Sequence, residues 1–383
     1  MRTEQSEIEL VVAPSRLARV IDHISRTPRV AVDIESNGFF RYHERICLVQ
    51  LATAEEVFLV DPLAIEDVQP LGDLMGDTSV EKVFHSPSYD LQSLDRDWGF
   101  RVRNLFDTSI GAALTGSAQL SLQGVVQEHL DVELKKNPKL QRSDWTRRPL
   151  RARALRYAAD DVLYLGRLRE VLVTRLKGLS RLQWAKEEFE RQERVRHLPR
   201  DRDSAFLSVK GSRTLDGKGL AILRSLYEFR EREARRIDRP LFKIMPDYAL
   251  ILLASDPDAD LPKVRGLGRF GRPPADKALK AAITKGLRSS PVTRPGRPLP
   301  ARDPLSPEEL KRAPARLRSL KDWRGRLGRR QQLEPSLLWP TVSLERLARH
   351  PASLDSELSS PEIRSWQRRA FGKELRTALA RFT

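Results

Sequence analysis

Short apolar runs alternate with polar turns through the first part of the chain. Three such runs, rich in Val, Ile, Leu and Phe, are typical of β-strands: 29–35, 45–53 and 56–61. Because only a few residues separate them, they predict a three-stranded meander. A further short strand is expected at 82–85, just before Pro87, a residue suited to the first turn of a helix that runs to Gly99.

Helical periodicity replaces the strand pattern farther along the chain. Apolar residues recur every three or four positions in 121–130 and 150–176, and a charged helix rich in Gln and Glu is expected over 181–200. Strands that give way to crossovers and helices predict an α/β or α+β domain with a mixed sheet. Beyond residue 200 there is little strand signal, so the remaining chain is expected to be helical.

Two segments have the composition of domain boundaries. The first is Leu198-Pro199-Arg200-Asp201, and the second is 289–304, whose Pro and Gly content predicts an exposed, semi-extended linker. We therefore expect three domains, at 1–195, 203–288 and 305–383.

The two C-terminal segments resemble each other. When Leu226 is placed on Leu320, an offset of 94 residues, apolar and arginine positions coincide without a gap. The matched positions are Phe229 with Trp323, Arg230 with Arg324, Arg232 with Arg326, Arg235-Arg236 with Arg329-Arg330, Pro246 with Pro340, and Leu250 with Leu344. The pattern predicts a duplicated helical module. Its repeated arginines form either a solvated helix face or a surface that faces phosphates.

Composition narrows the class of protein. The chain has 383 residues, 40% of them hydrophobic, and its six Trp and thirteen Phe favour folded domains over disorder. No apolar run approaches the roughly 20 residues of a membrane-spanning helix or resembles a signal peptide. The single Cys47 excludes an intramolecular disulfide and a cysteine-based zinc cluster. A soluble, cytoplasmic protein is therefore expected.

The formal net charge is +17, which favours a polyanionic partner. This charge is unevenly distributed, because residues 1–190 carry −3 and residues 191–383 carry +20. We therefore expect the C-terminal half to hold a nucleic acid, while the N-terminal half keeps its carboxylates for another purpose.

Several polar residues form a candidate constellation. Asp33 and Glu35 lie two apart on a predicted strand, so both side chains project from one face, where they repel each other unless a metal ion or an arginine lies between them. Asp90 lies where a strand leads into a helix, and Tyr157 and Asp161 share one helix face. Taken alone, each feature also suits a structural role: an arginine-neutralised pair, a polar residue in a first helical turn, or polar residues at the edge of a buried face.

Together these motifs resemble those of the DEDDy 3′→5′ exonuclease superfamily, and within it bacterial ribonuclease D. Asp107-Thr108 before a small-residue helix and the segment 140–150 strengthen the resemblance, and the two basic repeats resemble the HRDC (helicase and RNase D C-terminal) modules of that family. The resemblance implies an α/β ribonuclease H-like exonuclease domain followed by two all-α HRDC-type domains, of which the second is the more divergent.

The resemblance also implies the roles of site residues. Four carboxylates would hold two Mg²⁺ or Mn²⁺ ions: Asp33, Glu35, Asp90 and Asp161. Tyr157 would orient or help deprotonate the attacking water, and the family spacing leaves Asp160 as a solvated helix residue. Two further residues, Trp145 and Arg142, would either contact the 3′-terminal nucleotide or, for the tryptophan, pack against the domain. His85 is expected to be structural and stays outside the metal site.

The implied activity is metal-dependent hydrolysis of RNA from its 3′ end to nucleoside 5′-monophosphates, with tRNA precursors as the expected substrate and a monomer as the simplest assembly. Two alternatives remain at this stage. One is a 3′→5′ DNA exonuclease, which shares the chemistry, and the other is a catalytically silent nucleic-acid binding protein that retains the fold. Intact Asp33, Glu35, Asp90, Tyr157 and Asp161 weigh against the silent protein.

Overall fold

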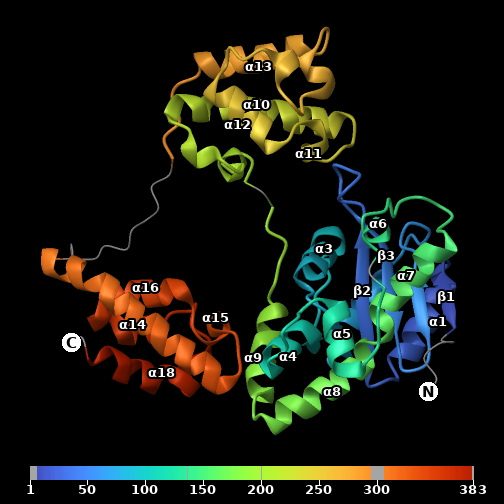
Figure 1. The fold of residues 1–383 in the computed structure, drawn as a ribbon. Coiled ribbons are helices and arrows are strands. Elements are labelled where there is room, and N and C mark those ends of the chain that lie inside the picture. Colours follow the sequence, from blue (N-terminus) through green and yellow to red (C-terminus); the bar gives the residue numbers. More distant parts are fainter. Residues whose placement is uncertain (1–6, 136, 200, 295–305, 382–383) are drawn as a thin grey trace.

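The computed structural model describes residues 7–135, 137–199, 201–294 and 306–381. Its N-terminal part is a mixed sheet with helices, and its two C-terminal parts are helical (Figure 1). Part of the expected linker, 295–304, and Arg200 of the first expected boundary lie outside the described residues. In the described part of the chain, no helix is both long enough and apolar enough to cross a membrane.

Six strands form one sheet in the order β1-β4-β3-β2-β5-β6. Their bounds are β1 Ile8–Val11, β2 Arg29–Ser36, β3 Ile46–Ala52, β4 Val57–Val60, β5 Glu81–Phe84 and β6 Leu105–Asp107. The expected meander is confirmed, since β2, β3 and β4 are consecutive antiparallel neighbours. The pairs β1 with β4, β2 with β5, and β5 with β6 are parallel, so the sheet is mixed as expected.

Nine helices accompany the sheet within the described residues up to 199. They are α1 Pro14–Ile24, α2 Gln69–Gly76, α3 Ser88–Trp98, α4 Thr108–Thr115, α5 Leu122–Leu130, α6 Pro138–Gln141, α7 Ala152–Leu163, α8 Leu165–Gly178 and α9 Leu182–Gln192. The periodicity over 150–176 belongs to two helices, which Tyr164 separates. The charged helix expected over 181–200 is shorter than predicted, because α9 ends at Gln192.

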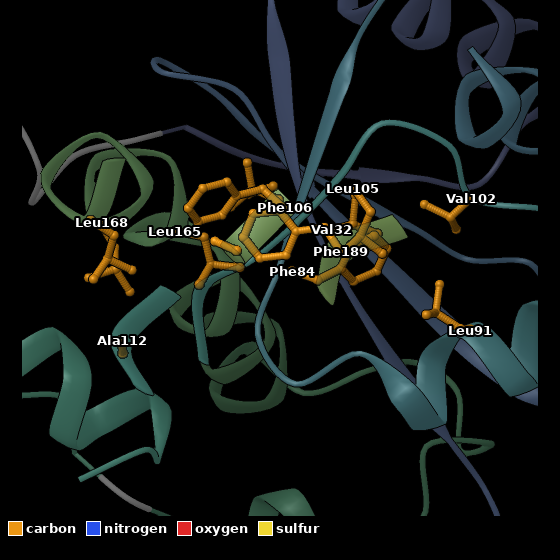
Figure 2. Close-up of a cluster of buried hydrophobic side chains, with 14 of the residues drawn as sticks. Val32, Phe84, Leu91, Val102, Leu105, Phe106, Ala112, Leu165, Leu168 and Phe189 are labelled. Carbon is orange, nitrogen blue, oxygen red and sulfur yellow. The ribbon is translucent and has the colours of Figure 1, made fainter. Parts of the chain in front are cut away.

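Aromatic side chains fill the core between the sheet and its helices. Figure 2 shows Phe84, Phe106 and Phe189 gathered with Val32, and the rings of Phe106 on β6 and Phe189 on α9 lie 4.6 Å apart. Each of these side chains is at most 5% exposed. Burial of one such side chain is worth about 2–3 kcal/mol, so this cluster fixes α9 against β6, the edge strand beside β5.

The remaining helices form two modules. The first module contains α10 Gly217–Arg236, α11 Leu241–Ile244, α12 Asp247–Ser255 and α13 Asp276–Arg288; the second contains α14 Pro307–Gln331, α15 Pro335–Leu338, α16 Thr341–Arg349, α17 Leu354–Leu358 and α18 Ser365–Leu379. Short 3₁₀ turns lie at Ala205–Ser208, Ser212–Thr214, Leu261–Lys263, Gly268–Gly271 and Pro351–Ser353. At the offset of 94, the bounds of α11 and α12 coincide with those of α15 and α16.

One pair of repeated arginines makes the same contacts in both modules. Arg230 is 3% exposed and donates to the Met245 carbonyl at 3.1 Å and to Asp247 at 2.7 Å. Arg324 donates to the carbonyl of Trp339 and to the Thr341 hydroxyl, both at 2.8 Å, and these two acceptors stand at the same offset of 94. This pair of arginines therefore joins helices, whereas the other repeated arginines are exposed: Arg232, Arg235, Arg236, Arg326, Arg329 and Arg330.

The second module packs directly on the N-terminal part (Figure 1). Trp366 stacks on Trp184 of α9 with ring centroids 4.7 Å apart, and its indole N–H donates to Glu188 at 2.7 Å. Arg181 donates to the carbonyls of Leu114 and Gln331, so it bridges α4 and α14. As a result, buried apolar residues of the N-terminal part and the second module form one continuous cluster, while the first module has a separate core.

Candidate active site

Asp33 and Glu35 lie on β2, a central strand that pairs with β3 on one side and β5 on the other. Alternation along the strand sends both carboxylates to one face and the buried Val32 and Ile34 to the other. Pairing with β3 shifts register between Glu35 and Ser36, so the strand bends directly after the second carboxylate. Pairing with β3 fixes the backbone that carries Asp33 and Glu35, whereas pairing with β5 ends at Ala31.

Asp90 reaches the site from the start of α3. Strand β5 runs parallel to β2 and ends at Phe84, so the turn that follows lies beside the carboxyl end of β2, where Glu35 is located. Within that turn Ser86 has a positive φ of 56°, and its N–H donates to Asp107 at 3.0 Å. Asp90 then falls in the first turn of the helix and is 8% exposed.

Tyr157 and Asp161 lie one turn apart on α7, which packs across β2, β3 and β4. The buried face of this helix is formed by Ala154, Ala158, Ala159 and Val162, small or β-branched residues that let the helix approach the sheet closely. Tyr157 and Asp161 are half-buried at the edge of that face. The helix therefore presents both side chains to the carboxylates of β2.

The four carboxylates act on one another electrostatically. Burial, followed by repulsion from Asp90, raises the pKa of Asp33 well above its usual range. Burial and the charges of Asp33, Asp161 and Asp90 likewise raise the pKa of Glu35. Burial raises the pKa of Asp161 to about 8, with Asp33 contributing, and that of Asp90 to about 7, with Asp107 contributing. The structure thus brings together all four carboxylates that the sequence singled out.

The donor chemistry of this cluster suits a hard divalent cation. Carboxylate oxygens are the ligands that Mg²⁺ and Mn²⁺ prefer, and no Lys, Arg or His in the described ranges makes an ion pair with any of the four. Like charges keep carboxylates apart unless a cation lies among them. In residues 7–135, 137–199, 201–294 and 306–381, no group of three or more His, Cys, Asp or Glu side chains is arranged to hold a metal ion. The arginine-neutralised alternative is therefore not what the fold contains.

Residues beside the constellation have structural partners. Asp160 pairs with Arg156 at 3.1 Å on the outer side of α7. The ring of His85 lies 2.8 Å from the Thr108 hydroxyl and 3.0 Å from the Leu120 carbonyl. Trp145 is 1% exposed, and its ring centroid lies 6.3 Å from that of Tyr157. The tryptophan therefore packs behind Tyr157 and is closed to a nucleotide.

Gln50 is a polar residue of this face that the sequence analysis missed. It stands directly opposite Asp33 in the antiparallel pair of β2 and β3, so both side chains project from the same face. Gln50 is 0% exposed, and neither its amide nitrogen nor its amide oxygen has a hydrogen-bond partner among the residues that the structure describes. A single glutamine inside the otherwise apolar run of β3 is the sequence signal that could have revealed it.

Comparisons with known proteins were made against families, sequences and structures. A 3′-5′ exonuclease family model matches residues 8–177, and an HRDC domain model matches residues 219–280. These two matches cover the sheet with the helices from α1 to α8, but not α9, and most of the first module. The second module lies beyond both of them.

Curated relatives named ribonuclease D span most of the chain. The protein of Granulibacter bethesdensis is 30% identical over 373 residues, which are 95% of this chain and 91% of that protein. The protein of Gluconacetobacter diazotrophicus is 29% identical over 371 residues, again 95% and 91% of the two chains. That of Xanthomonas oryzae is 35% identical over 268 residues, covering 69% of this chain and 72% of the relative.

Solved structures share the fold over nearly the full length. Escherichia coli RNase D aligns with a TM-score of 0.70 at 23% identity and covers 98% of this chain and 99% of its own. A protein from Bifidobacterium adolescentis aligns with a TM-score of 0.78 at 22% identity, covering 98% and 100%. The order of sheet, first module and second module is therefore shared with both.

Proposed function

The chain belongs to the ribonuclease D family of 3′→5′ exoribonucleases, and we propose that Asp33, Glu35, Asp90, Tyr157 and Asp161 form its active site. The observation that carries this assignment is the mutual electrostatic influence of four partly buried carboxylates from β2, α3 and α7, none of which makes an ion pair with a Lys, Arg or His of the described residues. Perturbed carboxylates gathered in this way are typical of catalytic sites.

Enzymes of this family use divalent metal ions, and we propose that this chain holds two of them, Mg²⁺ or Mn²⁺, on Asp33, Glu35, Asp90 and Asp161. When bound, such ions activate water and neutralise the charge that develops on the scissile phosphodiester. An acidic patch by itself would repel a polyanionic substrate. Cations bound among these carboxylates make the local charge positive, so the site can accept a phosphodiester.

Tyr157 is suited to hold and orient a water molecule. Burial, together with the charges of Asp161, Glu35 and Asp33, raises the pKa of its phenol far above neutral pH, so the side chain stays protonated. A protonated phenol can donate its O–H while its oxygen accepts another hydrogen bond. Trp145 packs against the ring and limits its movement. Of the two roles implied by the sequence, orientation of water fits this setting better than removal of its proton.

For the substrate we propose RNA with a 3′ extension, tRNA precursors in particular, from which nucleoside 5′-monophosphates are released. Exposed arginines of both helical modules supply phosphate contacts that do not depend on base sequence: Arg232, Arg235, Arg326 and Arg329. Such sequence-independent binding suits an enzyme that shortens RNA 3′ ends of different sequence.

We also propose that the chain divides into domains at 1–195, 203–288 and 305–383, and that the second helical module is a divergent HRDC-type domain. Support comes from the shared offset of 94, which matches α11 with α15, α12 with α16, and the hydrogen bonds of Arg230 with those of Arg324. Two unrelated helical modules would not repeat an arginine together with the positions of both of its acceptors.

The proposed site can be tested with 5′-labelled RNA that carries an unpaired 3′ extension. The purified protein should shorten it one nucleotide at a time with Mg²⁺ or Mn²⁺, stop when a chelator is added, and release 5′-monophosphates. Asp33→Ala or Asp161→Ala should lower the rate by roughly 100-fold or more. Asp160→Ala, which removes the neighbouring carboxylate and its pair with Arg156, is the matched control and should retain activity. Full activity of Asp33→Ala would overturn the assignment.

A further inference from the structure

The loop that follows β2 docks onto the first helical module. The Asp238 carboxylate, at the end of α10, accepts hydrogen bonds from the backbone N–H groups of Tyr42 at 3.0 Å and His43 at 3.2 Å. The Tyr42 hydroxyl donates to Glu231 at 2.6 Å, and Arg235 lies over the Tyr42 ring. These polar contacts hold the module beside the loop that begins after Ser36, the residue that follows Glu35.

Two exposed aromatic rings meet at this junction. Phe39 of the loop and Phe242 of α11 contact each other edge to face, with ring centroids 6.4 Å apart and an interplanar angle of 74°. They remain 53% and 52% exposed, although phenylalanine is usually buried. Beside them the ammonium group of Lys243 lies 4.2 Å from the centre of the Phe40 ring.

We propose that Phe39 and Phe242 together form a stacking site for bases of the unpaired 3′ segment of the RNA, a few nucleotides upstream of the scissile bond. This inference rests on the proposed function and adds to it the path of the substrate. Aromatic faces stack on any base, so the site would be indifferent to sequence, as an end-trimming enzyme requires. The exposed side chains of Lys243 and Arg239 supply positive charge for the adjoining phosphates.

The position of the pair agrees with this path. Phe39 follows Glu35 by four residues, so the backbone places it within roughly 14 Å of the proposed reaction centre. Phe242 comes from the other side of the junction, so a base that contacts both rings lies between the exonuclease part and the basic module. The rings are not needed for docking itself, because Asp238 and Glu231 bind the loop through Tyr42 and His43.

Equilibrium binding can test the site separately from hydrolysis. The full-length chain carrying Asp161→Asn, which should leave RNA intact, is titrated with a fluorescent RNA hairpin bearing a 3′ tail of unpaired adenosines. Adding Phe39→Leu or Phe242→Leu should weaken binding roughly tenfold, because leucine keeps an apolar contact between the two parts but offers no ring. Phe39→Trp should bind as well as phenylalanine or better. The loss should disappear for hairpins whose tail is too short to reach the pair.

A second measurement separates this site from the reaction centre. In the chain with intact carboxylates, Phe39→Leu and Phe242→Leu should hydrolyse a dinucleotide at the unmodified rate while they slow the shortening of long tails at low RNA concentration. Unchanged binding of the leucine variants, or an equal loss for long and short tails, would overturn the stacking site. If tailed RNA binds with the expected dependence on both rings but is never hydrolysed, the proposed function fails while the stacking site stands.

Discussion

At the scale of single residues, Gln50 carries a buried side-chain amide that has no hydrogen-bond partner among the described residues. A buried amide without hydrogen bonds costs about 1–3 kcal/mol, and this one faces Asp33 from the adjacent strand. We infer that Gln50 is a positioning residue, which orients the Asp33 carboxylate or a water molecule beside it when substrate is present.

Gln50→Leu should therefore separate stability from activity. Leucine removes the unsatisfied amide, so the free energy of unfolding should stay equal or rise by about 1 kcal/mol, while RNA hydrolysis should fall by roughly tenfold or more. Denaturant unfolding and the initial rate of RNA shortening measure the two effects. Trp323→Phe, which removes an unpartnered buried N–H from the second module, is the control and should keep full activity. Normal hydrolysis by Gln50→Leu would contradict the positioning role.

The sequence pointed to those residues of the proposed site whose spacing indicates a shared strand face or a shared helix face. Two carboxylates on alternate positions of a strand, and a tyrosine and an aspartate one helical turn apart, can be recognised without coordinates. Gln50 could not be recognised in this way, because its position opposite Asp33 depends on the register between β2 and β3. Trp145 was left open for a similar reason: whether it packs or binds a nucleotide depends on its burial behind Tyr157.

At the scale of elements, the repeated arginines divide into two kinds. Arg230 and Arg324 tie the long first helix of each module to the turn that precedes its apolar helix. Arg232 and Arg326, two residues later, are exposed. Helical periodicity explains this division, since positions two apart on a helix point in different directions. The sequence alone left both roles open for the whole set.

Substitution of the two kinds of arginine should affect different properties: the free energy of unfolding in one case and RNA binding in the other. Arg230→Met should lower the free energy of unfolding of the first module by about 2–4 kcal/mol, because it removes a charge-assisted hydrogen bond and leaves the Met245 carbonyl without its donor. Arg232→Met should cost less than about 0.5 kcal/mol but weaken RNA binding. Urea unfolding and RNA titration measure the two quantities. Equal destabilisation by both variants would contradict the division.

Strand prediction succeeded for the inner strands of the sheet and failed for its two edge strands. The runs that became β2, β3, β4 and β5 were identified within one or two residues of their bounds. The edge strands β1 and β6 were missed: only the last of the four residues of β1 is buried, β6 has three residues, and each strand pairs with one neighbour, β4 or β5. Such strands are held by their neighbours and carry little pattern of their own.

At the scale of the whole molecule, the positive charge lies on the helical modules and should dominate RNA affinity. Replacing three exposed arginines of the modules by glutamine should make the dependence of log affinity on log salt shallower by about 2. The three are Arg232, Arg326 and Arg329. Glutamine substitution of three arginines on α1 or just after it changes net charge equally and should alter the slope much less: Arg16, Arg19 and Arg26. Equal slopes for the two triple variants would show that net charge alone, not its placement, determines binding.

The continuous core shared by the sheet and the second module implies that parts far apart in the sequence unfold together. Gly116, with a φ of 88°, approaches the Gln332 carbonyl so closely that an added Cβ would lie 2.6 Å from its oxygen, and Trp366 stacks on Trp184 nearby. Parts joined in this way should unfold together on heating, whereas the first module, with its own core, should melt as a separate transition. The middle of the chain would then be the independent unit, and its two ends a single cooperative one.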